Sequence, residues 1–130
     1  METMELEAQI YAGLCGDTAL TALLASGADS IFHLQAPSDN LTRYPALVYT
    51  PISDVPALSG DDVELMHRVT IRLHILTRDG QYAAIYRRVH IIMQGLGFAR
   101  VQATPYVENG EKILILDYRI GVSAEWQQSV

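Results

Sequence analysis

The sequence predicts a single α+β domain in which helices pack on one face of an antiparallel β-sheet. Three observations lead to this class: a strand-length segment with alternating apolar residues, a long helical stripe of apolar residues after it, and a strong hairpin turn near the C-terminus. The 130 residues are enough for one domain with a real core. No repeat, low-complexity tract or linker divides them, so the predicted domain spans residues 1–130.

The N-terminal segment predicts two short helices. Leu6, Ile10 and Leu14 are spaced by four residues and form one helical stripe, which Gly16 ends. Asp17 is then a suitable N-cap for the second helix. Helices this short are not stable alone, so we expect them to pack on the sheet.

Two strands and a loop are predicted next. Residues 31–34 form a short extended run, and residues 45–52 form a strand rich in β-branched and aromatic residues. Because proline cannot donate to a ladder, Pro45 and Pro51 predict that this strand lies at a sheet edge. The Pro-, Gly- and Asp-rich residues 53–62 predict a loop, which we expect to be mobile in the isolated chain and ordered in assembly.

The second half of the chain carries the clearest patterns. Residues 64–77 alternate between apolar odd positions and polar even positions, as in a strand with one buried face. A helix is predicted from Asp79 to Gly95, and strands over 98–107 and 112–124 flank an Asn-Gly turn. The predicted order is therefore α-α-β-β-β-α-β-β.

No arrangement of residues indicates catalysis, a cofactor or a metal. One cysteine and four scattered histidines cannot form a four-ligand zinc site. The glycines around Leu96 end a helix, whereas phosphate-binding glycines precede one. The adjacent Asp61 and Asp62 lack further acidic partners at metal spacing. We therefore predict a protein that is not an enzyme and has no cofactor.

The net charge and the ends of the chain exclude further classes. A net charge of −6 argues against non-specific nucleic-acid binding over the whole surface. The acidic N-terminus is unlike a secretion signal, and no apolar stretch approaches the length of a membrane span. These features predict a soluble protein of the cytoplasm.

A separation of charge marks a candidate interface. If the C-terminal strands share a sheet, the face away from the helices carries Arg68, Arg72, His74, Arg100, Gln102, Thr104 and Arg119. Acidic residues gather instead in the N-terminal segment and in and beside the predicted loop. The face is either simply solvated or meets the acidic loop of the next copy in a head-to-tail contact that closes a ring. The candidate interface residues are Arg68, Arg72, Arg100, Arg119, Asp54, Asp61, Asp62 and Glu64.

Several segments, in order along the chain, resemble a phage tail-completion family. They include residues 10–14, 18–24, 31–37, 44–53, 67–76, 80–98 and 117–119. The resemblance implies a structural protein of the tail-to-head joining or tail-terminator type, in a phage or prophage. It also implies a homo-oligomeric ring, commonly of six copies, that contacts the tail tube and the head–neck connector. Such a protein is made in the bacterial host cytoplasm and ends in the virion tail or neck.

Other functions remain open from the sequence. One alternative is a different neck or tail adaptor, and a second is a small cytoplasmic protein-binding α+β domain. An enzyme with a site assembled across subunits is a third. The resemblance carries no catalytic residue, and the interface assignment depends only on the charge pattern. We expect neither a membrane nor a sequence-specific nucleic acid as a partner.

Overall fold

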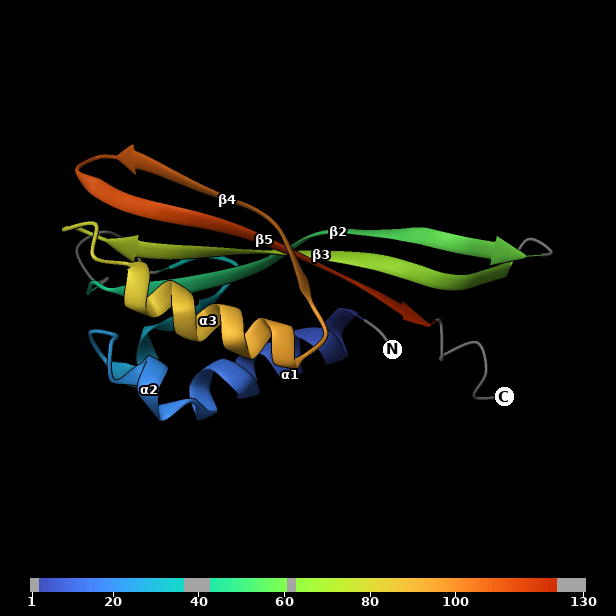
Figure 1. The fold of residues 1–130 in the computed structure, drawn as a ribbon, viewed down its shortest axis with the longest axis horizontal. Coiled ribbons are helices and arrows are strands. Elements are labelled where there is room, and N and C mark those ends of the chain that lie inside the picture. Colours follow the sequence, from blue (N-terminus) through green and yellow to red (C-terminus); the bar gives the residue numbers. More distant parts are fainter. Residues whose placement is uncertain (1–2, 37–42, 61–62, 124–130) are drawn as a thin grey trace.

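The described residues of the protein form a twisted five-stranded sheet with helices on one face (Figure 1). The structure, a computed structural model, describes residues 3–36, 43–60 and 63–123. The α+β class predicted from the sequence is confirmed. The elements are α1 (Thr3–Gly16), α2 (Thr18–Thr21), the 3-10 helix η1 (Gly27–Ser30), β1 (Ile31–His33), β2 (Ala46–Gly60), β3 (Val63–Thr77), α3 (Ala83–Gly95), β4 (Ala99–Glu108) and β5 (Glu111–Ser123).

The strands are ordered β1-β2-β3-β5-β4, and the sheet is mostly antiparallel. The exception is β1, which runs parallel to β2 and pairs with Leu47, Val48 and Tyr49. The predicted edge position of β2 is therefore wrong for these three residues, which lie between two strands. Beyond Tyr49, the only strand that pairs with β2 in the described chain is β3, and Pro51 lies in that part.

The core lies between the sheet and the helices. Val69, Ile71, Leu73 and Ile75 of β3 all point into it and are 0% exposed. They pack with the apolar stripes of α1 and α3, which confirms the alternation and the helical stripes predicted from the sequence. In the described part of the chain no helix is long and apolar enough to cross a membrane.

Local signals set several element ends. The Asp17 carboxylate accepts a hydrogen bond from the backbone N–H of Leu20 at 2.8 Å, which confirms the predicted cap of α2. Asn109 and Gly110 both have positive φ, 50° and 79°, as the predicted tight hairpin turn requires. The predicted start of α3 was wrong, because Asp79 accepts a hydrogen bond from Gln81 N–H in a turn and the helix begins four residues later.

The predicted loop over residues 53–62 is wrong for most of its length. Strand β2 continues to Gly60, and its pairing with β3 extends to Gly60 opposite Val63. Residues 55–60 and 63–68 form a hairpin, here called the arm, that projects beyond the helices (Figure 1). Register shifts follow Pro51 and Pro56, and a strand with one free side accommodates proline at such bulges. Composition alone therefore misjudged a bulged edge strand as a loop.

A candidate assembly interface on the open face of the sheet

The sheet face opposite the helices, here called the open face, carries most of the residues predicted for it. The register places Arg72 opposite Asp117 and Thr70 opposite Arg119 on neighbouring strands. Because side chains alternate along a strand, the residues that flank each core residue on the same strand point to the opposite face. The structure thus places these predicted residues on the open face: Arg68, Arg72, His74, Gln102, Thr104 and Arg119.

Arg100 is the exception, and its predicted position on the open face is wrong. It lies opposite Tyr118, a core residue on the helix side. Its guanidinium donates a hydrogen bond to the Tyr86 hydroxyl of α3 and lies 5.8 Å from the centre of that ring. A register shift between Arg100 and Gln102 inserts Val101 and inverts the alternation before it. A bulge of this kind cannot be seen in the residue pattern.

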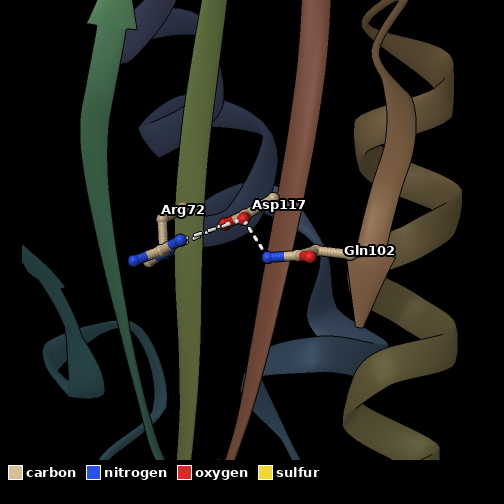
Figure 2. Close-up of polar contacts among 3 residues, drawn as sticks. All are labelled: Arg72, Gln102 and Asp117. Carbon is tan, nitrogen blue, oxygen red and sulfur yellow. Dashed lines mark hydrogen bonds and ion pairs between the residues drawn. The ribbon is translucent and has the colours of Figure 1, made fainter. Parts of the chain in front are cut away.

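Three side chains from three strands form a polar cluster at the centre of the open face (Figure 2). The Asp117 carboxylate accepts from Arg72 Nε at 2.8 Å and from Arg72 Nη2 at 3.0 Å, a two-pronged contact. Gln102 Nε2 donates to the same carboxylate at 2.7 Å. Asp117 is only 5% exposed. Its buried carboxylate is stabilised by Arg72 and Gln102, which lie on the two adjacent strands.

The cluster shifts the protonation of its members. Its bonds with Arg72, assisted by the bond from Gln102, lower the pKa of Asp117 below its usual value, although burial opposes the change. The bond with Asp117 raises the pKa of Arg72. Burial lowers the pKa of His74, and the Arg72 charge nearby adds to that effect. Arg72 therefore already has its partner within the chain.

Arg68 and Arg119 differ from Arg72. Both are exposed on the open face. Among the residues that the structure describes, neither makes a side-chain hydrogen bond or an ion pair. Of the four predicted basic interface residues, these two have charges that remain available to a partner.

The predicted acidic residues do not form one exposed surface. Asp54 Oδ1 lies 2.6 Å from His67 Nδ1, and the His67 side chain is buried at the base of the arm. Glu64 lies in β3 opposite Ser59. Asp61 and Asp62 fall outside the described residues. Asp54 thus has a partner within its own chain.

Sequence analysis missed a groove at the end of the open face away from the arm. Its floor comes from a second apolar cluster that includes Val48, Leu76 and Ile113. The groove has a volume of about 350 Å³, and His74, Tyr44, Tyr106, Glu108 and Glu111 complete its lining. The available signal was the apolar character of residues 48, 76 and 113, which occupy positions that strand alternation assigns to the wet face.

The described residues contain no group of three or more histidine, cysteine, aspartate or glutamate side chains that could hold a metal ion. The notable features of the molecule are instead surfaces: the polar cluster, the two exposed arginines, the arm and the groove. Together they describe a small α+β protein with a sheet face that no described helix covers.

Comparison with known proteins gives the particular family. The family model described as tail completion protein gp17 matches residues 8–110, so the chain belongs to this family. It is a structural component of phage-type tails and not an enzyme, as the sequence resemblance implied. No curated protein matches the sequence.

A solved structure shares the fold. A chain of the structure titled "Virion of native gene transfer agent (GTA) particle" superposes with a TM-score of 0.62. The match covers 92% of this chain and 95% of the other, with 15% sequence identity. At that identity the likeness establishes the fold, and it extends over nearly the whole of both chains.

Proposed function

We propose that this tail completion protein forms a homo-oligomeric ring, of six copies, at the head-proximal end of a phage tail. There it joins the tail tube to the head–neck connector, as a tail-terminator or head–tail joining protein does. The chain is made in the bacterial host cytoplasm and becomes part of the virion tail. Family membership supports the tail station, and the fold shared with a chain from a gene transfer agent virion agrees with it.

The observation that carries the ring is the pair of exposed arginines on an uncovered sheet face. Arg68 and Arg119 have no acidic partner among the described residues of their own chain. Such charges gain most from carboxylates on a neighbouring copy, because complementary charge fixes the register of an interface. In sequence, Asp61, Asp62 and Glu64 are one possible source, and the glutamates beside the groove are another.

The same face is a poor nucleic-acid surface. Arg72 is neutralised by Asp117, and Arg100 lies on the other side of the sheet. Two exposed arginines then remain for phosphate contacts, in a protein whose overall net charge is −6. Stable binding of phosphates needs several cations, so the open face suits contact between proteins.

Electron microscopy of particles made with and without the protein tests this function. Without it, we expect heads and tails that remain separate, and the wild-type chain supplied in trans should join them. A chain carrying Arg68→Glu and Arg119→Glu should fail to do so, whereas Arg87→Glu on the exposed side of α3 should succeed. Normal joined particles in the absence of the protein would contradict the proposed station.

A further inference from the structure

The groove on the open face has the features of a docking site that none of the described residues fills. Its floor is apolar, and two tyrosines line it, with the Tyr44 hydroxyl bonded to Glu111 at 2.5 Å. Glu108 and Glu111 stand directly opposite each other on β4 and β5. Like charges in that position destabilise a hairpin unless a cation lies between them.

No cation of the described chain forms an ion pair with either glutamate, and the Arg78 guanidinium lies over the Tyr44 ring instead, 4.6 Å from its centre. Lys112 is the basic residue nearest in sequence, but its side chain lies on the other side of the sheet against Gly80. In addition, His74 Nδ1 is buried beside the groove and has no hydrogen-bond partner in the described residues. The groove therefore combines an apolar floor, two glutamates whose bonds from Tyr44 and Tyr106 come from uncharged hydroxyls, and an unused polar atom.

The arm presents the complementary chemistry at the opposite end of the same face. Val55 lies opposite Arg68 in the β2–β3 ladder, and Met66 lies two residues away on the same side of β3. Val55 and Met66 are 45% and 37% exposed, so both offer apolar surface to a partner. Arg68 places an exposed positive charge beside them.

We propose that the arm of one copy docks into the groove of the next copy in the ring. Val55 and Met66 then cover the apolar floor, and Arg68 lies between Glu108 and Glu111. The two surfaces are unlike and lie at opposite ends of the open face, so the contact is head-to-tail and repeats until a ring closes. This assignment rests on the proposed ring and names the contact that forms it.

Sedimentation of purified variants tests the contact. An arm variant, Val55→Asp with Arg68→Glu, and a groove variant, Glu108→Lys with Glu111→Lys, should each weaken association at least roughly tenfold. The control for the arm variant, Ile91→Asp with Arg87→Glu on the exposed side of α3, likewise replaces one exposed β-branched side chain and one exposed arginine, with the same change of charge. It should associate as the wild type does. Circular dichroism spectra should show that all of these chains are folded.

Mixing the two variants gives the sharpest result. The arm variant keeps a working groove, and the groove variant keeps a working arm. An equimolar mixture should therefore form heterodimers but no ring, because each pair has one usable contact. A mixture that stays fully monomeric would overturn the head-to-tail arrangement.

Charge exchange identifies the acidic partner. In a chain with Arg68→Glu, adding Glu108→Lys should restore association, whereas adding Asp61→Lys and Asp62→Lys should not. Rescue by the aspartate changes alone would overturn the groove and identify Asp61 and Asp62 as the partners of Arg68. If the arm variant and the groove variant both formed rings as stable as those of the wild type, the proposed docking would also be overturned. The proposed station at the head-proximal end of the tail would not be affected. A wild-type chain that stays monomeric at assembly concentrations refutes the docking, and electron microscopy of the particles then decides the station independently.

Discussion

The two faces of this sheet are built from the same strands but are completed in different ways. On the helix side, Ile71 and Leu116 are fully buried under α1 and α3. On the open face, Arg72 is satisfied by Asp117, while Arg68 has no partner among the described residues. The side chains of the helix side are therefore buried within the chain, whereas those of the open face are only partly paired. We place contacts with other proteins at the open-face positions that have no partner among the described residues.

Removing core volume should break the helix side and produce the largest effect. Ile71→Ala or Leu116→Ala should lower the free energy of unfolding by roughly 2–5 kcal/mol, because both side chains are fully buried. Urea denaturation of the monomer would measure this. Val55→Ala on the exposed arm is the matched control and should cost about 0.5 kcal/mol or less. Equal losses at the two sites would contradict the distinction between the faces.

Breaking the polar cluster should cost less. Asp117→Ala removes the charged bonds to Arg72 and the bond from Gln102, at an expected cost of about 1–3 kcal/mol in unfolding free energy. The effect stays below that of a core cavity because Arg72 is partly exposed, so water can solvate its guanidinium. Gln102→Ala leaves the ion pair intact and should cost about 1 kcal/mol or less. The same denaturation curves check both variants, and a larger loss at Gln102 would refute the central role of Asp117.

Sequence patterns predicted the parts of the fold that local chemistry determines. The alternation over residues 64–77, the Asp17 cap and the turn at Gly110 depend on neighbours within a few residues. The resemblance likewise led to the correct family, because it uses the order of such segments along most of the chain.

The missed features depend on strand register, which local patterns do not contain. The bulge beside Arg100 inverted its side chain, and pairing with β3 turned the expected loop over residues 53–62 into the arm. The groove needs Val48, Leu76 and Ile113 from three strands to meet on one face. The partners of Arg72 and Asp54 were also unforeseen, since each lies on a different strand.

Lowering the pH should reduce the unfolding free energy in part through His74, which lies on the open face. Burial and the neighbouring Arg72 hold the pKa of His74 below its usual 6.5. The unfolded chain therefore binds a proton that the folded chain refuses, and this histidine's contribution to stability is lost as pH falls below about 6.5. Urea denaturation at pH 7.5, 6 and 5 should show a shallower loss for His74→Gln than for the wild type. Identical slopes would mean that the open face is better solvated than the structure indicates.

Raising the salt concentration should affect exposed Arg68 more than paired Arg72, and this prediction involves the smallest change in unfolding free energy. Raising ionic strength shortens the range of exposed charges, whereas a partly buried pair such as Arg72–Asp117 is screened much less. Between low and high salt, we therefore expect association between copies to weaken, because it uses the exposed charge of Arg68. The unfolding free energy of the monomer should change by only about 0.5 kcal/mol or less from surface charges of this kind.

Sedimentation and urea denaturation on the same samples measure the two effects, with Arg68→Ala as the control. That variant should associate weakly at every salt concentration and lose most of the salt dependence, because the screened charge is gone. If high salt instead lowered the unfolding free energy of the monomer while association stayed constant, the Arg72–Asp117 pair would be the salt-sensitive element. The exposed charge of Arg68 would then contribute nothing to association between copies.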